Sequence, residues 1–285
     1  LFKPGQDFKE RLNREKVPAI ETCALNCDWE TTVKLKNELI KLLPKDFLNP
    51  IPIVADLINE DDLVILVIPI DKEAPKGRLI LPQQQTIREI LDKKAMCLIV
   101  NEKNLFNSIH NLKQKPRAII TDSQVFKEVS GQAPDDILVT SFSILFARAK
   151  GDLEELVKGA QVLDNLKPDD KILIAEACTH HPIGEDIGRI KIPRWINQRI
   201  GGKINFDVFS GHNFPEDIKR YKLIIHCGAC MLNRKEMLSR ILECKEKGIA
   251  ITNYGVAIAY LHDALDKALQ PFNLFHRSGR MHPKF

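Results

Sequence analysis

The segments Lys171-Ile-Leu-Ile-Ala-Glu176 and Lys222-Leu-Ile-Ile225 decide the fold of the second half of this chain. Both are short apolar runs typical of buried strands, and a helical pattern follows each of them. Strands that alternate with helices form parallel sheets covered by helices. Cys178-Thr-His-His181 and His226-Cys-Gly-Ala-Cys230 follow the two runs. Their cysteines are therefore expected at the carboxyl ends of parallel strands, where open α/β sheets bind ligands.

The alternation of strand and helix extends from about residue 51 to the end of the chain. It predicts an α/β fold with two β/α domains and mainly parallel sheets, residues 51–140 and residues 141–285. The predicted strands are Leu63–Ile70, Met96–Val100, Ala118–Thr121, Ile137–Val139, Lys171–Glu176, Ile204–Phe209, Lys222–Ile225 and Ile249–Thr252. The predicted helices are Gln83–Lys94, Asn104–Gln114, Ser123–Val129, Ile144–Leu163, Ile190–Ile200, Arg234–Lys247 and Val256–Leu269.

Residues 1–50 have a different pattern. A polar stretch predicts a helix over Gln6–Glu15, a short strand follows over Val17–Cys23, and a second helix over Trp29–Leu43 stops at Pro44. One strand and two helices cannot bury a core of their own. We therefore predict that residues 1–50 are the remnant of another domain.

The composition excludes several classes of protein. Of the 285 residues, 44% are hydrophobic and 28% are charged, as in ordinary globular proteins. A net charge of +4, with both signs interleaved, argues against nucleic-acid binding. The longest apolar run, Leu63–Ile70, is too short to cross a membrane, and no signal peptide pattern opens the chain. Seven cysteines, an odd number, favour a reducing, cytoplasmic location over a disulfide framework.

Cys178, Cys227 and Cys230 are the candidate metal ligands. Three soft thiolates without an obvious fourth indicate an iron–sulfur cluster with one iron open to another ligand. Two alternatives remain open at this point. A histidine would complete a closed zinc site, and Cys227 with Cys230 alone would suffice for a thiol oxidoreductase. The candidates for a fourth ligand or a neighbouring role are His180, His226, Glu176, Glu185 and Asp186. Neither a phosphate-binding loop nor a Gly-x-Ser-x-Gly motif occurs, and no catalytic residue is assigned.

The pattern Cys178-x-His180 with His226-Cys-x-x-Cys230 resembles the cluster motif of the HydF family, the scaffolds of [FeFe]-hydrogenase maturation. The stretch Glu73-Ala-Pro-Lys-Gly-Arg-Leu-Ile-Leu-Pro-Gln83 resembles that family's dimerisation domain. The resemblance implies a homodimer that pairs through residues 51–140 and carries its cluster on residues 141–285. It also implies a [4Fe-4S] cluster and a diiron precursor built by two radical maturation enzymes. The loaded scaffold would then deliver that precursor to apo-[FeFe]-hydrogenase.

The resemblance also gives a meaning to residues 1–50. Members of the family begin with a GTPase domain, and Thr22-Cys-Ala-Leu resembles a diverged version of its guanine-contacting loop. Residues 1–50 would then be the closing strand and helix of that domain. GTP and Mg²⁺ are expected only of the missing part, so the given chain is expected to be a scaffold more than an enzyme.

Overall fold

The computed structural model describes residues 5–15, 17, 19–20, 29–42, 51–70, 77–177, 185–211, 214–215 and 217–272. The chain divides into two compact units, residues 1–50 and residues 51–285. The first unit contains helices α1 (Gln6–Arg14) and α2 (Trp29–Leu42). Val17, Ala19 and Ile20 are not in a strand, and the rest of the strand predicted there lies outside the described residues. The same holds for the Thr22 loop.

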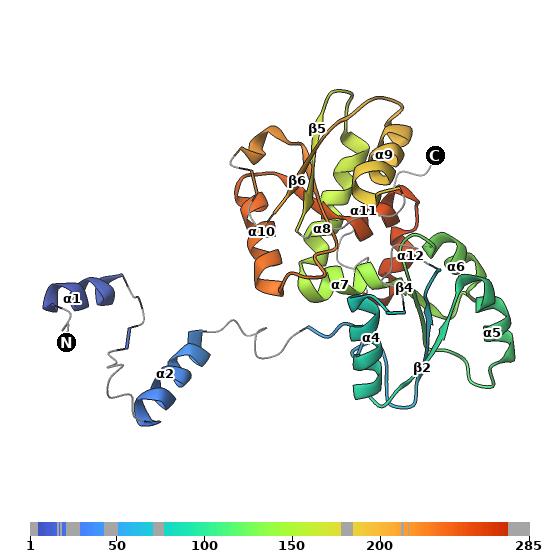
Figure 1. Ribbon diagram of the computed structural model, residues 1–285, viewed down its shortest axis with the longest axis horizontal. Helices are drawn as coiled ribbons and strands as arrows, with labels where there is room; N and C mark the ends of the chain where they lie inside the picture. Colours follow the sequence, from blue (N-terminus) through green and yellow to red (C-terminus); the bar gives the residue numbers. More distant parts are fainter. Residues whose placement is uncertain are drawn as a thin grey trace. The chain divides into compact units, whose positions relative to one another are not determined.

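The second unit contains two four-stranded parallel sheets (Figure 1). The first sheet has the order β2-β1-β3-β4, and its strands are β1 (Leu63–Val67), β2 (Met96–Val100), β3 (Ala118–Thr121) and β4 (Leu138–Ser141). The second has the order β6-β5-β7-β8, with β5 (Lys171–Glu176), β6 (Asn205–Ser210), β7 (Leu223–His226) and β8 (Ala250–Asn253). Every pairing is parallel, which confirms the predicted α/β class.

Helices follow the strands, as predicted. Those of the first sheet are α4 (Leu81–Asp92), the 3₁₀ turn η1 (Glu102–Asn104), α5 (Leu105–Asn111) and α6 (Phe126–Gln132). Between the sheets come α7 (Phe142–Lys150), α8 (Leu153–Gln161) and η2 (Val162–Asn165). The second sheet has the π-helix η3 (Ile187–Lys191), α9 (Ile192–Ile200), η4 (Ile218–Arg220), α10 (Arg234–Glu246), α11 (Tyr254–Leu261), α12 (Leu265–Leu269) and η5 (Gln270–Phe272).

Two of the predicted helices are each two helices. The pattern over Ile144–Leu163 is interrupted at Gly151, where α7 ends, and Asp152 starts α8 by accepting a hydrogen bond from the amide of Glu155 at 3.1 Å. The pattern over Val256–Leu269 breaks at Asp263, whose φ of 55° is left-handed. Apolar spacing alone does not show either break, because it continues through both.

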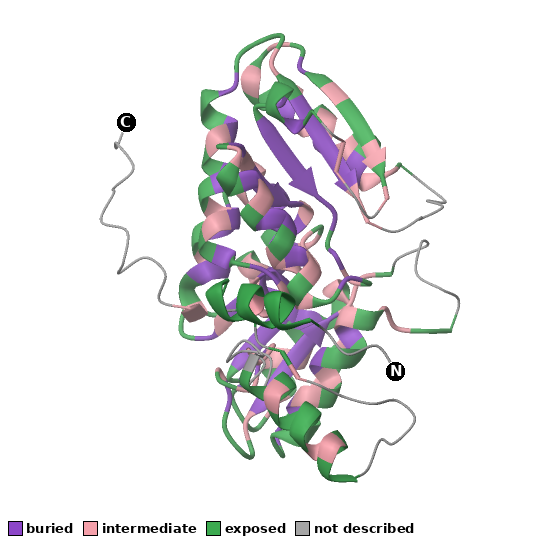
Figure 2. Ribbon diagram, turned by 90° about the vertical axis from the view of Figure 1, so that its left-hand side faces the viewer, coloured by how far each residue is buried: buried purple, intermediate pink, exposed green. Residues whose placement is uncertain are grey.

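Helix α7 joins the two sheets into one body. Phe142, Leu145 and Phe146 pack into the core on one face of the first sheet. Ile144 and Ala147 belong to a second cluster, which contains residues of both sheets. Figure 2 shows buried residues concentrated in the central strands. Helix α7 therefore touches both the sheet before it and the sheet after it.

Candidate metal centre

The second sheet places Cys227 beside the end of β5, the strand that precedes Cys178 in the sequence. In the order β6-β5-β7-β8 the direction of winding reverses between β5 and β7, which is the position where such sheets bind ligands. The amide of Cys227 donates to the carbonyl of Ala175 at 2.8 Å. The amide of Ala177 donates to the sulfur of Cys227 at 3.3 Å. Cys178 follows Ala177 in the sequence but lies outside the described residues, as do His180 and His181.

Cys227 and Cys230 lie on the turn that leads from β7 into α10. Cys227 is buried and Cys230 is partly exposed. Ala229, between them, has a left-handed φ of 52°, and the amide of Leu232 donates to its carbonyl at 3.1 Å. Helix α10 starts at Arg234, where Asn233 accepts a hydrogen bond from the amide of Glu236. The strand-to-helix position predicted for the cysteine pair is confirmed.

His226 is held by its neighbours through both ring nitrogens. Its Nε2 lies 2.8 Å from a guanidinium nitrogen of Arg240, which can only donate. Nε2 is therefore the acceptor, and Nδ1–H donates to the carbonyl of Cys227 at 2.8 Å. Arg240 is itself buried and also donates to the carbonyl of Gly211. In this arrangement His226 shapes the backbone at Cys227, and neither nitrogen is available to a metal.

The three candidate carboxylates all have cationic or amide partners. Glu176 accepts from Arg189 at 2.6 and 3.2 Å, and that hydrogen bond lowers its pKa. Glu185 pairs with Arg194, which lowers the pKa of the Glu185 carboxyl. Asp186 starts η3 by accepting from the amide of Arg189. Each would have to leave its partner to bind a metal.

Tyr254 was not recognised as a site residue in the sequence. A β-carbon on Gly188 would lie 1.9 Å from its hydroxyl oxygen, so only glycine fits there. The hydroxyl is buried and has no hydrogen-bond partner among the described residues. Burial raises the pKa of Tyr254, and the charges of Glu176 and Cys227 raise it further. A buried hydroxyl without a partner in the described part of the chain is an exception to the usual pairing of buried polar groups.

Two cysteines outside this turn differ in exposure. Cys244 on α10 is fully buried, and burial raises its pKa to about 12, as a packing role predicts. Cys97 on β2 is only partly buried.

Within the described residues, no three His, Cys, Asp or Glu side chains gather closely enough to hold a metal ion. None of the described helices is both long and apolar enough to cross a membrane.

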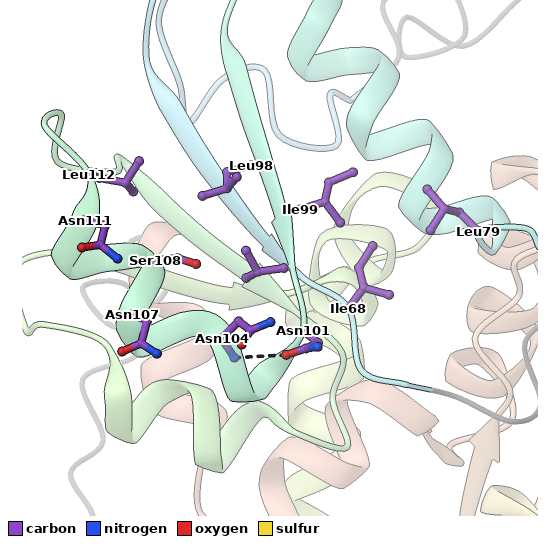
Figure 3. Close-up of a pocket in the computed structure, with 11 residues that line it drawn as sticks. Ile68, Leu79, Leu98, Ile99, Asn101, Asn104, Asn107, Ser108, Asn111 and Leu112 are labelled. Carbon is purple, nitrogen blue, oxygen red and sulfur yellow. Dashed lines mark hydrogen bonds between the residues drawn. The ribbon is translucent and has the colours of Figure 1, made fainter.

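A hollow of about 710 Å³ lies beside the outer strand of the first sheet (Figure 3). Its apolar lining includes Ile68, Leu98 and Ile99, and asparagines at the start of η1 and on α5 line one side. One of these, Asn101, accepts from the amide of Asn104 at 3.0 Å. The hollow contains no cysteine, so the first sheet offers a surface of a different kind from the second.

These features define an α/β protein that presents thiols at the switch point of a parallel sheet, the place between β5 and β7 where the strand order reverses. Sequence models of two domains identify its family. The hydrogen maturase F dimerization domain matches residues 53–151, and the hydrogen maturase F tetramerization domain matches residues 154–271. Together they cover most of the chain, which belongs to the hydrogen maturase F family.

Other comparisons add little. No curated protein matches this chain. Among solved structures, an NtrC family transcriptional regulator from Clostridium acetobutylicum is 12% identical, covers 73% of this chain and 96% of its own, and has a TM-score of 0.24. A 5,10-methylenetetrahydrofolate dehydrogenase from the silkworm, Bombyx mori, is 12% identical, covers 85% and 96%, and has a TM-score of 0.23. Such low scores carry no argument about this fold.

Proposed function

We propose that this chain is a scaffold that binds a [4Fe-4S] cluster through Cys178, Cys227 and Cys230. The observation that carries the proposal is the contact of Ala177 with the sulfur of Cys227 at the switch point. It supports an arrangement in which Cys178, the residue after Ala177, binds the same cluster as Cys227 and Cys230. Soft sulfur donors of this kind suit iron–sulfur clusters.

Three thiolates leave one iron for an exchangeable ligand. A carrier needs such a position, because a cargo held by four thiolates would be released with difficulty. His180 and the carboxylates of Glu176, Glu185 and Asp186 are the proposed exchangeable ligands. His226 acts beside them by orienting Cys227. The proposed cargo is a diiron precursor made by two radical maturation enzymes, and its acceptor is apo-[FeFe]-hydrogenase. GTP and Mg²⁺ would bind a complete N-terminal domain.

The family's dimerization domain supports a dimer formed through β2. Strand β2 is one of the two outer strands of its sheet, and among the described residues it pairs with β1 alone. Met96 and Ile99 are each 46% exposed. Exposed apolar edges recruit another strand, and a second copy of the same strand satisfies both edges by twofold symmetry. A monomer at micromolar concentration in light scattering would contradict this part of the proposal.

Anaerobic reconstitution with iron and sulfide tests the cluster. We expect a brown protein with about four iron atoms per chain, the iron content of one [4Fe-4S] cluster. Cys178→Ala should lose most of it, whereas Cys244→Ala, a matched control outside the turn, should keep it. A colourless protein with a single zinc would overturn the cluster and leave a structural zinc site. EPR showing a fourth cysteine on the iron would contradict the exchangeable position.

A further inference from the structure

Lys150 reaches the cysteine turn from the last residue of α7. Its Nζ donates to three carbonyls of that turn, those of Cys230 at 2.6 Å, Leu232 at 3.1 Å and Ala229 at 3.4 Å. A lysine ammonium has three hydrogens to donate, so one side chain uses its full capacity on a single turn. Lys150 therefore holds the backbone that carries Cys230.

Arg234 makes the same kind of contact in the opposite direction. It lies at the start of α10 and donates to the carbonyls of Gly151, Ala149 and Arg148 at 2.7, 3.0 and 3.2 Å. The last carbonyls of a helix have no partners within the helix, so a cation there is stabilising. Lys150 at the end of α7 thus caps the cysteine turn, and Arg234, which follows the turn, caps the end of α7.

The charge of Lys150 is directed at the cysteine turn. Burial lowers the pKa of Lys150, and the nearby Cys230 acts in the opposite sense. No carboxylate within the described part of the chain forms a salt bridge with it, although many exposed lysines do form one. Its positive charge therefore faces the carbonyl oxygens of Ala229, Cys230 and Leu232.

We propose that Lys150 is a positioning residue for the metal-binding turn and fixes the backbone that carries Cys230. The inference rests on the proposed cluster function. Helix α7 falls in the stretch matched by the dimerization domain, whereas the turn falls in the tetramerization domain. A complete metal-binding turn thus requires residues from both matched domains.

Helix α7 also holds the point at which the chain enters this unit. Arg148 donates to the carbonyls of Pro52 and Ile53 at 2.8 and 2.9 Å and pairs with Asp56 at 2.7 Å. Arg148 and Lys150 are two residues apart on the same helix. Helix α7 therefore contacts both residues 52–56 and the cysteine turn.

Lys150→Met tests the inference, with Lys158→Met as the matched control. Lys158 lies on α8, is 64% exposed and pairs with Glu155 at 3.6 Å. In the metal-free protein, we expect amide hydrogen exchange of residues 227–233 to accelerate in Lys150→Met alone. After reconstitution, iron release to a chelator should be about 10- to 100-fold faster, as is usual when a residue supporting a metal ligand is lost.

Lys150→Gln keeps two amide hydrogens without the charge, and it serves if the Met variant does not fold. Unchanged exchange in the turn would overturn the inference. So would faster exchange with unchanged iron release, because Lys150 would then be purely structural. If the wild type takes up no cluster, the proposed function fails. The exchange experiment on the metal-free protein still decides whether Lys150 holds the turn.

Discussion

The two sheets of this protein have the same topology and different surfaces. Each has its first strand beside its second and third, and its fourth outside the third. In each sheet, the last residue of the fourth strand is the N-cap of the helix that follows. Ser141 ends β4 and accepts a hydrogen bond from the amide of Ile144, and Asn253 ends β8 and accepts one from the amide of Val256. The repeated scaffold is not visible as a repeat in the sequence, since only the buried pattern is shared.

The difference lies at the switch points. In the first sheet, the side-chain amide of Gln83 donates to Asp122 after β3 at 3.2 Å. In the second, thiols follow the strands, and the hydroxyl of Tyr254 has no partner within the described residues. On the outer strands, β2 exposes Met96 and Ile99, whereas β6 exposes Val208 together with the polar Asp207 and Ser210. The second sheet lies in the stretch matched by the tetramerization domain, so the two sheets differ chiefly in the thiols of the second.

The outer strands should give the largest effect. Ile99→Lys on β2 should weaken the dimer by about 100-fold or more in Kd, because each copy would bring an unpaired ammonium into the contact. Val208→Lys is the matched change on β6, where Val208 is 43% exposed. It should leave the dimer intact. Light scattering at micromolar concentration measures both variants, and a dimeric Ile99→Lys protein would show that β2 is not the contact.

The covering helices provide the second comparison. A β-carbon at Gly159 on α8 would lie 1.8 Å from the carbonyl oxygen of Ile251, whereas one at Gly131 on α6 meets nothing within 4 Å. Gly159→Ala should lower the free energy of unfolding by about 3 kcal/mol, because backbone must move to make room. Gly131→Ala should raise it by about 0.5–1 kcal/mol through helix propensity. Urea unfolding measures both, and changes of the same sign would contradict the tight packing of α8 on β8.

Much of this architecture could be predicted from the sequence. The strands and most helices follow from hydrophobic spacing, and Cys227 and Cys230 follow a strand because the apolar run stops at Ile225. The order of the strands could not be predicted. Met96–Val100 is as apolar as Leu63–Val67, yet β2 lies at the edge and β1 in the centre. Local composition describes a strand's faces but does not identify its neighbours.

The contacts around the metal-binding turn were also beyond sequence reasoning. Lys150 precedes Cys230 by 80 positions, and no spacing rule connects them. Tyr254 and Gly188 form a close contact only because α11 and η3 meet in space. His226 stood beside Cys227 in the sequence, but its partner Arg240 came from the next helix and decides which nitrogen accepts. Such roles depend on tertiary contacts between elements distant in the chain.

The switch point of the first sheet should be sensitive to loss of the polar contacts of Gln83. Gln83 is 5% exposed, accepts from the amide of Ile80 at 3.1 Å and donates to Asp122 at 3.2 Å. Gln83→Leu should lower the free energy of unfolding by about 2 kcal/mol, because the backbone amide of Ile80 would lose its acceptor and the carboxylate of Asp122 would lose a donor. Gln84→Leu, on the exposed neighbour, should change it by about 0.5 kcal/mol at most. Equal effects in urea unfolding would remove this distinction between the sheets.

The Tyr254 hydroxyl in the second sheet's half of the unit should respond in the opposite direction. Tyr254→Phe removes a buried hydroxyl without a partner in the described part of the chain and should raise the free energy of unfolding of the metal-free protein by about 1 kcal/mol. Tyr221→Phe is the control, because that hydroxyl donates to Asp207 at 2.8 Å and accepts from Arg220. It should cost about 1 kcal/mol. A loss of stability in Tyr254→Phe would mean that the hydroxyl is already satisfied, and this contrast between the two sheets would then disappear.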